Sequence, residues 1–392
     1  MIDKISYIQC CLCKSCADKC PVSAILFEKE INGFLYPVID TERCIHCEAC
    51  ETVCPVLKVR NEMEGEFPKA YAARSQSREV RMNSTSGGLF FEAAKYVISN
   101  GGYVCGTVLD EHFKVKHVIS DSIAEVEKMR GSKYAQSDTT GIYSQIQNLL
   151  LKEKQVVYSG CPCQAAALKA FLGKDYDNLI IIDFVCHGIP SQKMLNDYLE
   201  SLEKRYSSRI HTVYFRSKVM GWHSSSVWVM FENGKIYTNP ITVDPYMKAF
   251  LSGTSMKESC YSCSFKSFTS GSDITLGDFW GAETVLPEFD DNTGISAMFV
   301  NSARGERLVE NLQVDLLEVN KDDIIVYNRN IIVPSQKNEL RDAFLEAASV
   351  SGFGNAITEY FTESLQDRLQ RKLFFSLRSV YYRITGKNKP LY

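Results

Sequence analysis

The sequence predicts two fold classes in one chain: a small cysteine-rich α+β domain at the N-terminus, and a larger α/β domain with a mixed α+β continuation. Two copies of one cysteine pattern fall within residues 10–55, and beyond residue 65 short apolar runs alternate with segments of helical periodicity. Further along, Asn233-Gly234 joins two strand-like segments. This dipeptide predicts a β-hairpin, because both positions of its usual turn take positive φ.

Length and composition describe an ordinary globular protein of more than one domain. At 392 residues the chain is too long for a single core, so we expect two or three domains. The formal net charge of −3 indicates no general affinity for nucleic acid, and we expect no nucleic-acid partner. No run approaches the roughly 18–20 apolar residues of a membrane-spanning helix. Residues 1–9 lack the apolar core of a signal peptide, which favours a reducing, cytoplasmic setting.

Eight cysteines near the N-terminus follow the pattern C-x2-C-x2-C-x3-C-P twice. In two-cluster ferredoxins this spacing gives three thiolates to one 4Fe-4S cluster and sends the fourth to the other cluster. We therefore predict a ferredoxin-like domain with two 4Fe-4S clusters. One cluster is assigned Cys10, Cys13, Cys16 and Cys54, and the other is assigned Cys44, Cys47, Cys50 and Cys20.

Two other uses of these cysteines fit less well. A disulfide framework belongs to small secreted domains, for which the N-terminus provides no secretory segment. Structural zinc uses C-x2-C pairs, but three cysteines at successive x2 gaps and a fourth before proline, given twice, favour iron–sulfur clusters. Cys11 lies outside the register, and we interpret it as a small buried hydrophobe.

A charged stretch separates this domain, residues 1–64, from the next one, residues 65–206. Glu62, Glu64 and Glu66 precede Pro68 there and fit a linker. The second domain alternates expected strands with expected helices, as an α/β fold requires. The strands are 70–73, 103–109, 115–119, 156–158 and 179–184, and the helices are 89–98, 141–151, 163–172 and 192–202.

A third domain is predicted over residues 207–340, with strands at 209–216, 227–232 and 235–239. Residues 341–392 are expected to form a helical, basic C-terminal extension. Between Arg368 and Lys389 seven basic residues interleave with leucines and aromatic residues, a pattern that suits an amphipathic helix. We expect this helix to pack on the rest of the chain with its basic face in solvent, ahead of the alternative that it contacts a membrane surface.

Six more cysteines occur beyond residue 54. Cys105 sits inside an apolar strand and is interpreted as a buried hydrophobe. Cys161 and Cys163 follow one expected strand, and Cys186 follows the next, so the two turns meet at one sheet edge if the strands are parallel. Cys260 and Cys263 add a C-x2-C pair. Four thiolates from three loops could hold a third cluster, although spacing alone does not bring them together.

Several short motifs occur between about residues 70 and 300, and they are specific in combination rather than singly. They are Ser84-Thr85-Ser86-Gly87-Gly88, Arg130-Gly131-Ser132-Lys133-Tyr134, Gly160-Cys161-Pro162-Cys163-Gln164, Val185-Cys186-His187-Gly188 and the segment 273–281 around Gly277-Asp278-Phe279-Trp280-Gly281. Together they resemble the motifs of one known family, the beta subunits of coenzyme F420 hydrogenase/dehydrogenase and their homologues.

The resemblance implies FAD in the α/β domain, which would thus be flavin-binding, and a third 4Fe-4S cluster beside it. Carried over position by position, the ligands of that cluster are Cys163, Cys186, Cys260 and Cys263. Cys161 departs from the family pattern, where a non-cysteine residue commonly precedes the proline, so it stays open whether Cys161 replaces Cys163.

The residues of the first two motifs also suit a flavin pyrophosphate on physical grounds. Ser84, Ser86, Gly87 and Gly88 open an expected helix, and small residues let the N–H groups of a helix N-terminus approach a phosphate. Ser132 and Lys133 could add a hydroxyl and a point charge. His187 is the candidate proton carrier, with cluster tuning as the alternative, whereas Asp278 is interpreted as structural.

These inferences predict an FAD-dependent iron–sulfur oxidoreductase. Electrons would pass between ferredoxin or a partner subunit, the clusters, FAD and a small-molecule substrate. That substrate is a deazaflavin coenzyme or another metabolite, including one of polysaccharide biosynthesis, and neither the direction of flow nor the oligomeric state follows from the sequence. The alternative is a non-catalytic electron-transfer subunit of a larger redox complex, which would lack the flavin or the substrate site.

Overall fold

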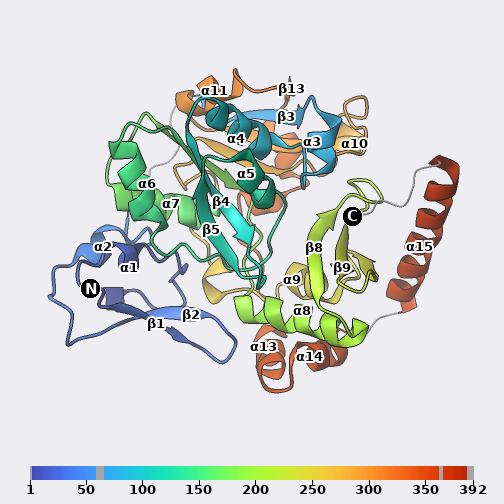
Figure 1. Ribbon diagram of the computed structural model, residues 1–392, viewed down its shortest axis with the longest axis horizontal. Helices are drawn as coiled ribbons and strands as arrows, with labels where there is room; N and C mark the ends of the chain where they lie inside the picture. The colour runs from blue at the N-terminus through green and yellow to red at the C-terminus, as the bar shows by residue number, and fades with distance from the viewer. Residues whose placement is uncertain (1, 59–65, 362–364, 386–392) are drawn as a thin grey trace.

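The computed structural model describes residues 2–58, 66–361 and 365–385 of the chain (Figure 1). The N-terminal unit holds a hairpin and two short helices that lie within the cysteine motifs. Its strands β1 and β2 pair antiparallel, with Ile25 opposite Ile39. The elements are η1 (Ile2–Lys4), α1 (Ser15–Lys19), β1 (Ile25–Lys29), β2 (Leu35–Ile39) and α2 (Ala49–Thr52).

The larger part of the chain is built on an eight-stranded mixed sheet with strand order β13-β3-β12-β11-β7-β6-β4-β5. Strands β4, β6, β7 and β11 run parallel to one another. The near-continuous apolar run of β7 is buried, as expected for a strand covered on both faces. The strands are β3 (Lys69–Ser75), β4 (Tyr103–Leu109), β5 (Val115–Ser120), β6 (Val156–Gly160), β7 (Leu179–Phe184), β11 (Ile274–Asp278), β12 (Ser296–Val300) and β13 (Val314–Glu318).

Helices connect these strands and cover the sheet (Figure 1). Buried side chains of α4 pack with those of the central strands around Val97, and those of α6 and α7 pack around Tyr158. The helices are α3 (Arg78–Met82), α4 (Leu89–Ser99), α5 (Ile123–Met129), α6 (Ile142–Leu151), α7 (Pro162–Leu172), α10 (Ala282–Val285), α11 (Ala303–Val309) and α12 (Lys321–Ile325), with the 3-10 helix η3 (Arg329–Ile331). The mixed α/β architecture expected from the sequence is confirmed.

A second sheet of three antiparallel strands, order β10-β9-β8, stands beside the main sheet. Its aromatic core includes Tyr198 of α8 and Tyr246 of α9, whose rings stack. The elements are α8 (Gln192–Tyr206), β8 (Ile210–Ser217), β9 (Ser226–Phe231), β10 (Ile236–Pro240), α9 (Pro245–Leu251), η2 (Glu258–Cys260), α13 (Arg341–Val350) and α14 (Phe353–Tyr360).

Two details differ from the sequence expectations. The hairpin at Asn233-Gly234 forms, but only Gly234 takes positive φ (+78°), because the loop between β9 and β10 is four residues long rather than two. Strands β11, β12 and β13 fall within the predicted 207–340 domain, yet they pair in the main sheet with β7 and β3. The second sheet therefore lies between two halves of one larger sheet in chain order, and the domain boundaries stay predictions.

The C-terminal helix α15 (Leu365–Thr385) lies at the far side of the second sheet (Figure 1). Leu365, Leu369, Leu373 and Leu377 recur every four residues, so they share one face, and all four are exposed. The expectation that this apolar face packs on the chain is therefore wrong for these leucines, while Phe374 is buried. Across the described ranges of the chain, no helix is long and apolar enough to cross a membrane.

Candidate cofactor-binding site

The two cysteine motifs at the N-terminus adopt the same backbone. Leu12 and His46, at equivalent positions, both have φ of 54°, and the equivalent pair Lys14 and Glu48 have φ of 60° and 59°. A left-handed conformation is costly for residues with a Cβ, so its repetition at matched positions marks two copies of one loop. Each such loop leads into a short helix, α1 or α2.

Cys54, from the second motif, lies beside the cysteines of the first motif. It lines one small cavity together with Cys10, Cys13 and Cys16, which are the four residues that the exchanged-ligand pattern assigns to one cluster. Of the other assigned set, Cys20 and Cys50 pack on the apolar cluster of Cys16 and Cys54, and Cys47 is exposed at the surface. Four thiols around one cavity are the donor set that a 4Fe-4S cluster takes, so the residues fit that group.

A second group of thiols surrounds a cavity of about 320 Å³ between the N-terminal unit and the main sheet. The residues come from the start of α7, the loop after β7 and the segment around η2. They are Cys163, Cys186, Cys260 and Cys263, which are the four that the resemblance implies. The geometry thus gathers in one place cysteines that lie up to a hundred residues apart in the chain.

The spacing of the sulfur atoms separates iron–sulfur clusters from mononuclear zinc. A tetrahedral zinc with Zn–S bonds of about 2.3 Å needs four sulfurs roughly 3.8 Å apart. In the described part of the chain, the one set of three candidate ligand side chains with ligand atoms within 4.8 Å of one another is His223, Glu283 and Asp290. No three cysteine sulfurs of the described residues lie within 4.8 Å of one another, which favours iron–sulfur clusters over a single zinc ion.

Two further thiols lie close to these four cysteines. Cys161 caps α7 and lines the larger pocket on the other side of Cys186, whose pKa its hydrogen bond lowers to about 7. Cys11 is buried, lines the cavity beside Cys163 and hydrogen-bonds to that thiol. Its interpretation as a spare hydrophobe captures its burial but misses its position between two cysteine sets.

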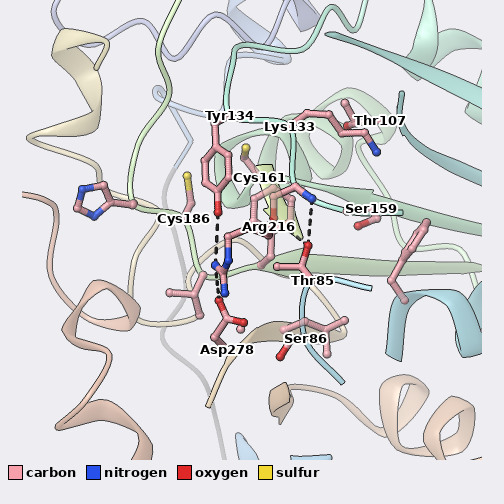
Figure 2. Close-up of a pocket in the computed structure, with 18 of the residues that line it drawn as sticks. Thr85, Ser86, Thr107, Lys133, Tyr134, Ser159, Cys161, Cys186, Arg216 and Asp278 are labelled. Atoms are coloured by element: carbon pink, nitrogen blue, oxygen red, sulfur yellow. Dashed lines mark hydrogen bonds and ion pairs between the residues drawn. The ribbon is translucent and has the colours of Figure 1, made fainter. Parts of the chain in front are cut away.

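The larger pocket, about 400 Å³, opens at the carboxyl ends of the parallel strands (Figure 2). Thr107 of β4, Ser159 of β6 and Asp278 of β11 line it, as do Cys186 and His187 from the loop after β7. In open α/β sheets this edge is where ligands bind. The lining also includes apolar side chains, among them Leu89 and Phe250.

The first two motifs meet at the rim of this pocket. The hydroxyls of Thr85 and Ser132 lie 3.1 Å apart, and the Ser132 N–H donates to Thr85 Oγ1. Gly87 must be glycine, because a Cβ there would stand 2.4 Å from the carbonyl oxygen of Ala73. Gly88 has φ of +89° and begins α4, so the N-terminus of an eleven-residue helix faces the pocket.

Ser84 and Ser86 are held by their neighbours. Ser84 Oγ accepts a hydrogen bond from Arg130, and Ser86 Oγ donates to the carbonyl of Ile295. The buried Lys218 donates to the carbonyls of Ser86, Arg81 and Thr293, each at 2.7 Å. These hydrogen bonds hold the loop that precedes α4 in place without a bound ligand.

Lys133 lines the pocket, but its ammonium is engaged elsewhere. Nζ donates to the carbonyls of Lys128, Met129 and Arg130 at the end of α5, at 2.8–2.9 Å. A lysine ammonium has three protons, so no donor is left for a phosphate in this arrangement. Burial lowers the pKa of Lys133 to about 7. Its phosphate-binding role stays a prediction that this geometry does not support.

His187 lies between the two spaces and lines both. The Asn330 amide lies 2.8 Å from Nδ1, which places the ring proton on Nε2 when that amide donates. Nε2 is buried and has no partner among the described residues. Burial, and then the charge of Lys266, lower the pKa of His187. Both effects favour the neutral form of the imidazole.

The sequence did not predict the group of interacting side chains that Arg216 forms inside the pocket with Asp278, Tyr134 and Trp280. Arg216 donates to Asp278 at 3.0 Å, lies 3.5 Å from the hydroxyl of Tyr134 and stands 5.1 Å from the ring centre of Trp280 (Figure 2). Its Nε and Nη2 are buried without partners among the described residues. Asp278, interpreted as structural, also accepts a hydrogen bond from the indole of Trp222. Asp278 is therefore held in place and in turn orients Arg216, whose Nε and Nη2 have no partner among the described residues.

The three spaces form a continuous series. The small N-terminal cavity and the middle cavity share Cys11 and Val56, and the middle cavity and the large pocket share Cys186 and His187. Each space is thus separated from the next by one layer of side chains. The second cysteine motif, whose Cys47 is exposed, adjoins the small cavity at the outer end of this series, because its Cys50 packs with Cys16 and Cys54.

Two segments of the chain match models of known families. Residues 153–323 match the family model for the C terminus of the beta subunit of coenzyme F420 hydrogenase/dehydrogenase, and residues 9–57 match that of the 4Fe-4S dicluster domain. No curated protein matches the chain. Among solved structures it is similar to a chain described as "Xenon derivatization of the F420-reducing [NiFe] hydrogenase complex from Methanosarcina barkeri". The two are 17% identical with a TM-score of 0.45, over 79% of this chain and 97% of that one.

The resemblance noted in the sequence motifs is therefore confirmed at the level of families. Residues 153–323 carry the C-terminal domain of the beta subunits in the coenzyme F420 hydrogenase/dehydrogenase family, behind a 4Fe-4S dicluster domain at residues 9–57.

Proposed function

We propose that this chain is an FAD-dependent iron–sulfur oxidoreductase that moves electrons between a redox partner and a small molecule. Electron transfer of the iron–sulfur oxidoreductase type follows from the two matched domains. The observation that carries the finer proposal is the series of three adjoining spaces. Two of them are each lined by four assigned cysteines and by the shared Cys11, and the third lies at the ligand-binding edge of the sheet.

The residues around the large pocket suit a dinucleotide flavin. The α4 N-terminus, which lines the pocket at Gly88 and Leu89, offers backbone N–H groups to a pyrophosphate, and the two glycines let this loop pack closely on β3. The open nitrogens of Arg216 offer a bidentate site for an anionic group of the flavin or of the substrate. Bound there, FAD would exchange electron pairs with a substrate and single electrons with the clusters.

His187 is the residue that we propose to hold a proton for the substrate step. It lines the large pocket, and burial of its ring favours the neutral imidazole, which can accept or release a proton. A side chain that moves a proton has to reach the reacting molecule, and His187 lies at the wall of the pocket proposed to hold it. The competing role is to donate a hydrogen bond toward the middle cluster, because His187 also lines that cavity.

Ferredoxin or a partner subunit would exchange electrons at the outer end of the series. Cys47 is exposed there, and its neighbour Ile45 is 59% exposed, so a partner can approach this motif without rearrangement. The substrate that we propose is a deazaflavin coenzyme or another small metabolite, with polysaccharide biosynthesis as one source.

The proposal is tested by anaerobic purification and reconstitution of the full chain, followed by flavin analysis and a screen of electron donors. We expect one FAD per chain, about twelve irons, and bleaching of the flavin band by reduced ferredoxin, a reduced nicotinamide or a reduced deazaflavin. Iron near twelve with no flavin bound at any added concentration would overturn the FAD proposal and favour the non-catalytic electron-transfer subunit. Colourless, iron-free protein after reconstitution would overturn both.

A further inference from the structure

Lys257 is a buried lysine at the junction of the N-terminal unit and the middle cavity. Its side chain is 1% exposed, and its Nζ has no hydrogen-bond partner among the described residues. The ammonium lies 3.6 Å from the ring centre of Tyr36 and 5.4 Å from that of Phe34, both in the N-terminal unit. Lys257 also lines the middle cavity, three residues before Cys260.

This placement is costly unless a negative charge lies nearby. A buried ammonium without hydrogen-bond partners loses its hydration, and the cation–π contacts return only about 2 kcal/mol. The nearest acid in sequence, Glu258, is already paired with Lys337 and Arg341. Lys257 instead lines the middle cavity with Cys260 and with Gln9 and Cys11, the two neighbours of Cys10, so it lies beside both adjoining cysteine sets.

We propose that Lys257 is a shared counter-charge for the cluster of Cys10, Cys13, Cys16 and Cys54 and for the cluster of Cys163, Cys186, Cys260 and Cys263. The inference rests on the proposed iron–sulfur function but not on the flavin. A reduced cluster carries one more negative charge than an oxidised one, and Coulomb attraction is strong where water is excluded. A fixed ammonium therefore stabilises the reduced form of both clusters and raises their midpoint potentials. Lys257 is a positioning residue in this role.

The chain offers matched variants to test it. Lys257→Met keeps the length and apolar body of the side chain without its charge, and Lys257→Arg keeps the charge. Lys337→Met is the control, because this neighbouring lysine is 38% exposed and is already paired with Glu258 and Asp342. Each full-length protein is reconstituted anaerobically, its iron is counted, and its clusters are titrated with a reductant while electron paramagnetic resonance is recorded.

We expect Lys257→Met to keep its iron and to shift two of the three cluster signals to more negative potential, while the third stays in place. Lys257→Arg and Lys337→Met should titrate like the unchanged protein. If Lys257→Met loses iron while Lys257→Arg retains it, the clusters need the positive charge of residue 257 to form, and this result supports the same role.

Iron-loaded Lys257→Met with unshifted signals would overturn the inference, as would Lys257→Arg behaving like Lys257→Met. The flavin has no part in either readout. Protein that binds iron but no FAD would thus end the flavin proposal and leave this one standing, whereas protein without iron would end the proposed iron–sulfur function itself.

Discussion

Replacing Cys163 with serine tests the assignment of the middle cluster. The structure supplies three sets of four assigned cysteines, which correspond to about twelve irons per chain when every set is filled. Cys163 lines the middle cavity with Cys186, Cys260 and Cys263, so its loss leaves three of the four assigned thiols there, beside Cys11. We expect Cys163→Ser to fall to about eight irons per chain, a loss of one third. Iron and protein are measured after anaerobic reconstitution, with electron paramagnetic resonance to show which signal disappears.

Two other cysteines provide the controls. Cys161→Ser should keep about twelve irons, because Cys161 lines the large pocket rather than the middle cavity. Cys105→Ser should do so as well, since Cys105 is fully buried inside β4. The assignment is refuted if Cys161→Ser loses four irons while Cys163→Ser keeps them, which would mean that the thiol hydrogen-bonded to Cys186 is the true ligand.

Three more predictions follow from the large pocket and the sheet beneath it. Gly87→Ala forces a methyl to within 2.4 Å of the Ala73 carbonyl and should weaken FAD binding about tenfold or more, measured by quenching of flavin fluorescence; unchanged affinity would contradict the role of this loop. Lys133→Met removes the hydrogen bonds to three carbonyls at the end of α5 and should lower the free energy of unfolding, measured in urea, by about 1–3 kcal/mol. If the variant instead bound FAD with a weaker salt dependence, Lys133 would contact a phosphate. Burial raises the pKa of Asp183 from 3.8 to about 6, so the folded protein binds this proton more tightly than the unfolded chain does. The stability that this carboxyl contributes is therefore lost as pH rises from about 4 to 6, by up to about 3 kcal/mol. The unfolding free energy of the unchanged protein should fall relative to that of Asp183→Asn over this range, and a constant difference between the two proteins would refute the prediction.

Local patterns in the sequence predicted most of the elements that build the site. The apolar runs at β6 and β7 and the helical periodicity of α7 and α8 depend on neighbouring residues, and they fold as expected. The cysteine motifs are local too, and their repeated spacing predicted even the exchange of Cys54 into the first set, which lines one cavity in the structure.

What the sequence could not predict depends on contacts between distant segments. Nothing local to Lys133 shows that its ammonium turns back onto the end of α5, and nothing near Arg216 shows that Asp278 will hold it inside the pocket. The return of β11, β12 and β13 to the main sheet was missed for the same reason, because strand pairing is a long-range choice and the hairpin at β9 and β10 gave the stronger local signal. Cys11 and Lys257 gain their meaning only from the docking of the N-terminal unit.

The second sheet separates Cys186 from Cys260 along the chain, and this has a consequence for how the protein is made. A nascent chain whose second sheet has not yet folded offers iron only part of the middle set of thiols. Bringing the missing pair back costs the entropy of closing a long loop, which folding of the insertion offsets. We therefore expect a cluster at this position to assemble late in maturation, only after the second sheet has folded and brought Cys260 and Cys263 to Cys163 and Cys186.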